Sequence, residues 1–304
     1  MRRRTSPIAI LAMALAAALV GAGCSSSTAS GGGTEGPAPE PIDPNAPPPP
    51  EGGHGAAVSY SPVRGAAYRL EHRDSLVLQY PGGASQTQAR DRVAFLHLTL
   101  AGAPEQGTYS VAITLDSLVA LESGTPVPAD SVAAARRTIW SGTLSSVGTL
   151  SPLKADRSGT LTDELAGHLR LLFPALPQGG VREGMQWTDS TQYPLVSDAF
   201  TGTESSVTVY RATDKKETEG REAIPLETSS KYNRAGKRVQ AEQELEMTAS
   251  GTRTGVHRLG VDGVLVSAQG TDIGEMMISV PALGQTVPIT RSSTYAVTSV
   301  APGR

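Results

Sequence analysis

The stretch "RVQAEQELEMTA", residues 238–249, shows most clearly which fold class the chain adopts. Its apolar residues share one parity of the numbering, and the other parity is held by Gln240, Glu242, Glu244, Glu246 and Thr248. A period of two is typical of a strand with one buried face and one solvated face, whereas a helix spaces its apolar residues three and four apart. The stretch therefore predicts a β-strand whose buried face carries Val239, Ala241, Leu245, Met247 and Ala249.

The same alternation recurs in "AYRLEHRDSLVLQY" (67–80) and "TYSVAITLDS" (108–117). Turn signals separate the alternating runs; they lie at residues 81–83, 101–107, 219–220, 233–236 ("NRAG") and 262–263. Alternating runs joined by short Gly- or Pro-containing turns are typical of antiparallel hairpins. The sequence thus predicts a mainly β fold, an antiparallel meander.

Two segments depart from this period. Residues 128–140 have a helical composition, and "TLTDELAGHLRLLFP" (160–174) places Leu161, Leu165, Leu169 and Leu172 on one helical stripe. We expect two short helices that cover the apolar face of the sheets. The body, residues 58–304, is predicted to form two sheet-rich parts, 58–155 and 175–304, joined by a helix over 160–173.

The N-terminus has the pattern of a secretory signal. Three arginines, Arg2 to Arg4, precede an apolar run from Ile8 to Val20, which is too short to span a bilayer as a helix. Residues 24–57 consist mostly of Ser, Gly, Pro and Ala, and such a composition cannot bury enough apolar surface to fold. We predict a signal peptide over 1–23 and a disordered tether over 24–57.

Cys24, the only cysteine of the chain, directly follows the signal in "LVGAGCSSS" (19–27). This surrounding resembles the lipobox of bacterial lipoproteins, with Gly23 and Ala22 before the cysteine. The resemblance implies that Cys24 is lipidated and that the protein is anchored to a membrane of the cell envelope. Ser25, where the inner-membrane class carries aspartate, implies the outer membrane, with the body in the periplasm or at the surface. The alternative is a plain secretory signal and a soluble protein with a free thiol.

The segment "FPALPQGGVREGMQW", residues 173–187, resembles a motif of β-rich bacterial lipoproteins with no established activity, in which FP-x-LP precedes a turn and a G-x-x-W sequence. Phe173, Pro174, Leu176, Pro177, Val181, Gly184 and Trp187 match that motif. The resemblance agrees with the predicted fold and location and implies no reaction.

Few residues suggest catalysis. "SPLK" places Ser151 and Lys154 at the S-x-x-K spacing of penicillin-recognising enzymes, but the surroundings favour a loop over the helix that this chemistry needs. Glu164 and His168 could supply two metal ligands, although a solvent-facing ion pair is favoured. We predict no catalytic set, no metal site and no cofactor.

The chain has 26 basic and 29 acidic residues and no basic run, so nucleic-acid binding is excluded as a function. The apolar residues of "DIGEMMISVPALGQTVPI" (272–289) exceed what two short helices can cover. We therefore place an apolar ligand site at Met276 and Ile278, with Trp187 as a further candidate, against the alternative that these side chains fill the core.

Together these patterns predict a non-enzymatic, lipid-anchored envelope protein that binds an apolar ligand or another envelope protein. A serine-type hydrolase acting on cell-wall or ester substrates and a purely structural surface lipoprotein remain the alternatives.

Overall fold

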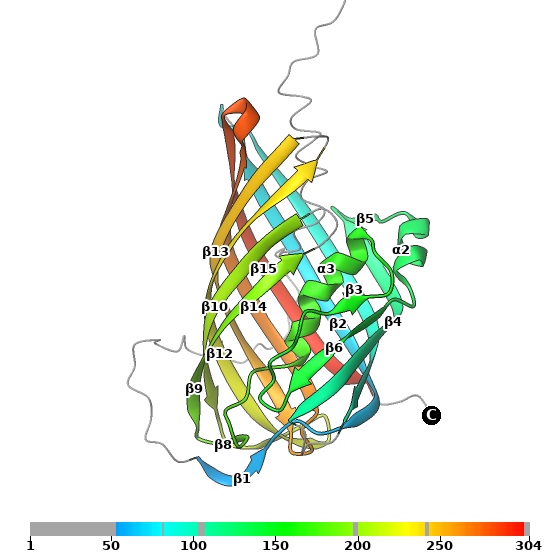
Figure 1. The fold of residues 1–304 in the computed structure, drawn as a ribbon, viewed down its shortest axis with the longest axis vertical. Helices are drawn as coiled ribbons and strands as arrows, with labels where there is room; N and C mark the ends of the chain where they lie inside the picture. Colours follow the sequence, from blue (N-terminus) through cyan, green and yellow to red (C-terminus); the bar gives the residue numbers. More distant parts are fainter. Residues whose placement is uncertain (1–52, 81, 103–106, 197–199, 241–242, 301–304) are drawn as a thin grey trace, which may run out of the picture.

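The computed structural model describes residues 53–80, 82–102, 107–196, 200–240 and 243–300, so the predicted signal, Cys24 and nearly all of the tether lie outside the described residues. Most described residues form antiparallel strands, which confirms the mainly β prediction (Figure 1). The strands are β1 (His54–Val58), β2 (Val63–Gln79), β3 (Ser85–Ala101), β4 (Thr108–Glu122), β5 (Thr125–Pro126), β6 (Ile139–Ser145), β7 (Lys154–Ala155), β8 (Val181–Glu183), β9 (Gln186–Val196), β10 (Phe200–Ala212), β11 (Lys216–Thr218), β12 (Arg221–Gln240), β13 (Gln243–Gly260), β14 (Leu265–Val280) and β15 (Gln285–Val300).

Thirteen strands form one strongly curved sheet, with the order β7-β6-β4-β3-β2-β15-β14-β13-β12-β10-β9 and β5 and β11 attached to β4 and β12 (Figure 1). Strands β1 and β8 form a separate two-stranded sheet. The strands of the two predicted parts share the large sheet, because the last strand, β15, pairs with β2 from Ala67↔Val300 to Leu78↔Ile289. The large sheet is therefore continuous across both parts.

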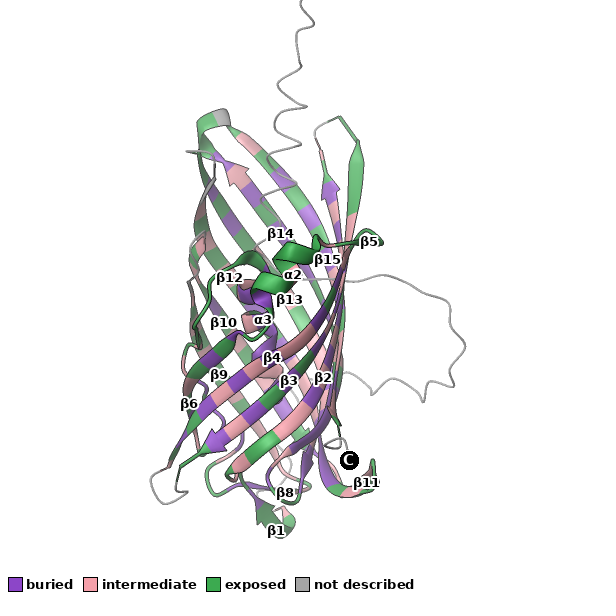
Figure 2. Cartoon of the chain, turned by 90° about the vertical axis from the view of Figure 1, so that its right-hand side faces the viewer, coloured by how far each residue is buried: buried purple, intermediate pink, exposed green. Residues whose placement is uncertain are grey.

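Both predicted helices are present. The first, α2 (Ala129–Ala135), is shorter than the predicted segment 128–140, because Arg137 has a positive φ and β6 begins at Ile139. The second, α3 (Thr160–His168), continues into the 3-10 helix η3 (Leu169–Leu172). The predicted leucine stripe of this segment is buried, and α3 lies against the concave face of the sheet (Figure 2).

Three layers follow one another along the concave face. A first apolar cluster contains the leucines of α3 and η3 together with residues such as Leu70, Leu96 and Trp140. A second apolar cluster occupies the far ends of β2, β13, β14 and β15. A charged layer lies between them; its buried members include Asp74, Arg90, Arg92, Glu164, Glu204, Asp272 and Arg291. Polar residues at inward positions explain why the period-two pattern is interrupted at the middle of several strands.

Two turn assignments differ from the prediction. The stretch 238–249 contains a hairpin, because β12 ends at Gln240 and β13 begins at Gln243, although Leu245 and Met247 are buried on one face as expected. The segment "NRAG" (233–236) lies inside β12 and forms no turn. Gly236 faces Gly202 on β10, and a Cβ built on Gly236 would lie 2.3 Å from the ring of Phe200, so an aromatic ring fills the space above this glycine pair.

Candidate functional site

Met276 and Ile278 lie in the second apolar cluster, where each side chain is 3% exposed. In the sheet, Met276 is flanked by Ile289 on β15 and Ala249 on β13, and Ile278 by Val287 and Met247. All members of the cluster come from the inner face of four neighbouring strands: Leu76, Leu78, Leu245, Met247, Met276, Ile278, Val280, Val287 and Ile289. The structure thus brings two of the three predicted ligand residues together on one apolar surface.

Trp187 lies elsewhere, on β9 beside the first cluster. Its ring stacks on Tyr210 with the ring centroids 5.1 Å apart, and its indole N–H donates a hydrogen bond of 3.2 Å to the carbonyl of Ala175. Tyr60 donates a 2.6 Å hydrogen bond to the carbonyl of Pro174 in the same segment. The FP-x-LP motif is therefore a packed corner between η3 and β8, which gives Trp187 a structural role.

A hollow of about 620 Å³ lies on the outer face of the same strands that carry Met276. Apart from Gln79, its exposed lining residues belong to two rows that cross the sheet, one running through Thr203, Ala235, Thr248, Met277 and Pro288 and the other through Ser205, Asn233, Ser250, Glu275 and Thr290. Met277 is 41% exposed there, whereas the adjacent Met276 is buried on the opposite face. The hollow is thus lined by polar and apolar residues alike, and Met276 and Ile289 of the second cluster contribute to its floor from within the sheet.

An ion network borders the second cluster on the inner face. The Glu204 carboxylate on β10 contacts Arg234 and Arg253, with the Arg253 contact at 2.9 Å. Asp272 on β14 contacts Arg253 at 2.8 Å and Arg291 at 3.2 Å, and it accepts a 3.0 Å hydrogen bond from the Tyr232 hydroxyl. Burial raises the pKa of Glu204, but Arg253 and Arg234 outweigh it and lower that pKa to about 2. Both carboxylates are therefore paired charges.

A second group joins α3 to the sheet. Glu164 on α3 and Arg92 on β3 are both fully buried, with Arg92 Nε 2.9 Å from Glu164 Oε1. His168 packs against His72 of β2, with the ring centroids 3.7 Å apart and the ring planes tilted by 32°. The expectation of a solvent-facing Glu164–His168 ion pair is therefore wrong: the two side chains face inward, and Glu164 pairs with an arginine that lies far away in sequence.

Ser151 and Lys154 do not lie on a helix. Ser151 lies in a loop, its hydroxyl accepts a 2.8 Å hydrogen bond from the Thr143 N–H, and Lys154 begins the short strand β7, which pairs with β6. Lysine thus does not lie one helical turn from serine, which is the arrangement that S-x-x-K chemistry uses.

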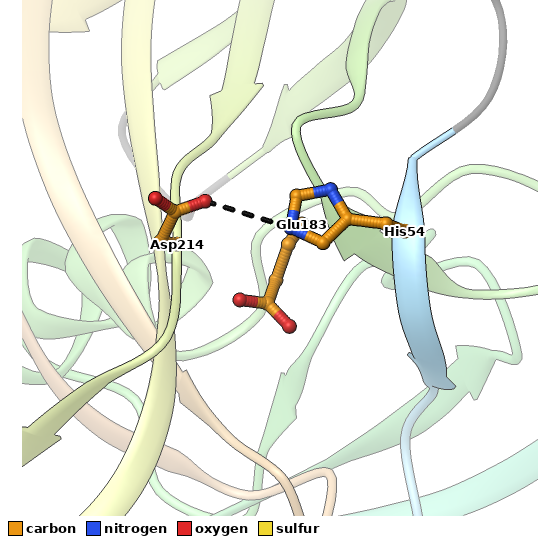
Figure 3. A group of neighbouring side chains, drawn as sticks. All are labelled: His54, Glu183 and Asp214. Carbon is orange, nitrogen blue, oxygen red and sulfur yellow. Dashed lines mark ion pairs between the residues drawn. The ribbon is translucent and has the colours of Figure 1, made fainter.

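A third group of polar side chains, His54, Glu183 and Asp214, lies at the end of the molecule where β1 pairs with β8 (Figure 3). One donor atom from each residue lies within 4.8 Å of the others. The three positions are far apart in the sequence and follow no recognisable spacing, so the sequence could not indicate this group.

No helix among the described residues combines the length and the apolar character needed to cross a membrane.

Comparison with known proteins identifies no family. No family model matches the chain, and no curated protein matches it. One similar solved structure, described as "Asymmetric conductivity of engineered proteins", is 8% identical with a TM-score of 0.19. A triple mutant of Rhodopseudomonas blastica porin is 7% identical with a TM-score of 0.19. Both alignments cover 79% of this chain and 100% of the other, and at these scores neither informs the fold or the function.

Proposed function

We propose that the protein is a lipid-anchored protein of the bacterial cell envelope whose β body binds an apolar chain on the second apolar cluster. The observation that supports this most is the composition of that cluster. Its nine members all come from four neighbouring strands, whereas the first cluster also contains four leucines from α3 and η3. The nine side chains are buried, and Tyr80, Phe200 and Ala249 pack against them without a described α-helix, so an apolar chain would bind among side chains of the sheet itself.

The chemistry of the cluster suits a flexible apolar ligand. Met276 and Met247 have unbranched side chains that adapt to irregular partners, and the neighbouring Leu, Ile and Val side chains present no polar atoms. Each methylene that such a surface removes from water contributes roughly 0.8 kcal/mol. An acyl chain is therefore the ligand class we favour, and an apolar segment of another envelope protein is the second.

The anchor is a separate part of the proposal and rests on Cys24 and the tether. One acyl chain binds a membrane only marginally, whereas two or three hold a protein durably, so a lipidated Cys24 would keep the body at the membrane. The full-length protein should partition into detergent and incorporate labelled palmitate, whereas Cys24→Ser should do neither. Equal partitioning of both chains would contradict the anchor.

Neighbouring methionines on opposite faces allow a matched test of the ligand site. We would titrate an environment-sensitive fluorescent fatty acid into the mature chain and into Met276→Glu and Met277→Glu. Met276→Glu puts a charge into the second cluster and should abolish saturable binding, whereas Met277→Glu changes only the outer face and should bind like the wild type. Because Met276→Glu can unfold the protein, Met276→Ala and Ile278→Ala accompany it, and each should weaken binding severalfold while a cooperative melting transition is retained.

The possible results are distinct. Absence of saturable binding by the wild type would overturn the proposed function, as would alanine variants that fold and bind like the wild type. Loss of binding in Met277→Glu alone would place the ligand in the outer hollow instead. No observation favours the hydrolase alternative, and labelling by a fluorophosphonate that disappears in Ser151→Ala would revive it.

A further inference from the structure

We propose that His54, Glu183 and Asp214 form a binding site for a divalent transition-metal ion, best matched by Zn²⁺, which fastens the first strand of the body to the large sheet. The three residues come from β1, from β8 and from the connection between β10 and β11. Figure 3 shows the three side chains near one another, with the His54 ring facing the Asp214 carboxylate in an ion pair.

The distances are close to those of a metal-bound arrangement. Zinc bonds of 2.0–2.2 Å to nitrogen and oxygen at tetrahedral angles separate neighbouring ligand atoms by roughly 3.4 Å. His54 Nε2 lies 3.7 Å from Asp214 Oδ1, and all three donor atoms lie within 4.8 Å of one another. The side chains of His54 and Asp214 are 71% and 81% exposed, so small rotations can bring them onto an ion without disturbing the core.

Backbone contacts hold Glu183, the least exposed of the three proposed ligands, in place. Glu183 lies opposite His54 in the β1–β8 pair, and its Oε2 accepts a 2.9 Å hydrogen bond from the Lys215 N–H. That hydrogen bond is the largest of several causes that lower the pKa of Glu183. A Cβ on Gly55 would lie 2.8 Å from Glu183 Oε1, so glycine at this position keeps the second carboxylate oxygen accessible.

One neighbouring cation competes for the site. The Lys215 ammonium lies 3.7 Å from Glu183 Oε1 and 3.9 Å from Glu222 Oε1. Glu222 can therefore retain the lysine when a metal ion takes Glu183. With Asp214, Glu183 and Glu222 against this single lysine, the group carries an excess of negative charge, which favours a divalent cation.

The ligand set indicates the metal class. One imidazole with two carboxylates suits zinc and its transition-metal neighbours, whereas calcium and magnesium prefer sites made only of oxygen atoms. Three protein ligands leave a fourth position for water or for a further group. Since β1 contains the last four residues of the predicted tether, 54–57, a bound ion would hold the point where the tether meets the body.

Zinc titration tests the site directly. Every chain is free of tags and carries Cys24→Ser, so that no thiol competes for the ion. Isothermal titration with Zn²⁺ should give one saturable site, and His54→Ala and Asp214→Ala should each weaken binding at least tenfold. Cobalt bound in place of zinc should show visible absorption bands of a four-coordinate site, and both variants should lose them.

The matched control is His97→Ala. His97 is also exposed and also pairs with a carboxylate, Asp116, on the neighbouring strand, but it is no part of the three-residue group. It should bind zinc like the parent chain. The proposal is overturned by a parent chain without one-to-one saturation, by unchanged affinity in His54→Ala, or by equal losses in His54→Ala and His97→Ala. The substituted residues are exposed, so unchanged melting temperatures without zinc will exclude unfolding.

Discussion

At the scale of single residues, the imidazole rings of His72 and His168 are held between β2 and α3, where water is excluded. Burial is the main cause that lowers the pKa of both, and for His168 it falls to about 3. Nearby positive charges lower the two pKa values further; they belong to Arg90, Arg92, Arg234 and Arg253. The nearest acidic residue on the same helix as His168 is Glu164. Both rings are therefore neutral in the folded protein at neutral pH.

This predicts a loss of stability in mild acid. An unfolded histidine titrates near pH 6.5, so below that pH the unfolded chain binds protons that the folded chain excludes. The free energy of unfolding should fall as the pH drops from about 6.5 toward about 3. His168→Gln should reduce the loss between pH 7 and pH 5 by roughly 2 kcal/mol, measured by urea denaturation at both values. Any packing that the substitution removes lowers the free energy of unfolding equally at both pH values, so it does not affect the change between them. If wild type and His168→Gln lose the same stability between pH 7 and pH 5, His168 is not a buried neutral histidine.

The sequence predicts some of these residues and misses others for a physical reason. Parity alone places Leu245 and Met247 on the buried face, because a strand alternates regardless of what it packs against. The burial of His72 or Arg92 depends on partners that α3 supplies from about seventy to one hundred residues away. No local pattern records such a contact, so the charged layer and the His54 group emerge only in three dimensions.

At the scale of elements, paired glycines shape the curved strands. Gly251 faces Gly274 across β13 and β14, and Gly255 faces Gly270 on the same two strands. Tyrosine side chains take the space above each pair: the Tyr232 hydroxyl lies 2.5 Å and 2.6 Å from Cβ atoms built on Gly251 and Gly274, and Tyr295 covers the other pair. A glycine inside these strands thus marks a place where an aromatic ring packs closely on the backbone. Glycine does not indicate a turn at these positions, nor in the "NRAG" segment of β12.

Gly274→Ala should therefore destabilise the protein. Its Cβ would lie 2.6 Å from the Tyr232 hydroxyl and 2.7 Å from the Ser250 carbonyl. The Ser250 carbonyl belongs to the hydrogen-bonded strand β13 and the Tyr232 ring is buried, so neither can move away. We expect a loss of about 1–3 kcal/mol in the free energy of unfolding. Gly167→Ala is the matched control: Gly167 is exposed on α3 and has no atom within 4 Å of the added carbon, so it should gain about 0.5–1 kcal/mol. Equal effects of both changes would contradict this account of the strand glycines.

At the scale of the whole molecule, the pairing of β2 with β15 makes the two predicted parts one hydrogen-bonded sheet. Further contacts cross the same boundary: β1 pairs with β8, and the Tyr68 hydroxyl donates a 3.0 Å hydrogen bond to the carbonyl of Leu265. The first apolar cluster draws members from both parts, including Leu96 and Leu226. Loss of either part would expose a long strand edge and an apolar face of the other.

The two parts should therefore unfold together, and each contains one tryptophan that reports on it. Trp140 is buried on β6 in the first part, and Trp187 stacks on Tyr210 in the second. In Trp187→Phe the fluorescence follows the first part, and in Trp140→Phe it follows the second, while far-UV circular dichroism follows the whole sheet in both. Within each variant the fluorescence and dichroism midpoints in urea should coincide, since a shared sheet and a shared core make partial unfolding costly. Separate midpoints in either variant would show that the two parts unfold as independent units and that the β2–β15 pairing contributes little to cooperativity.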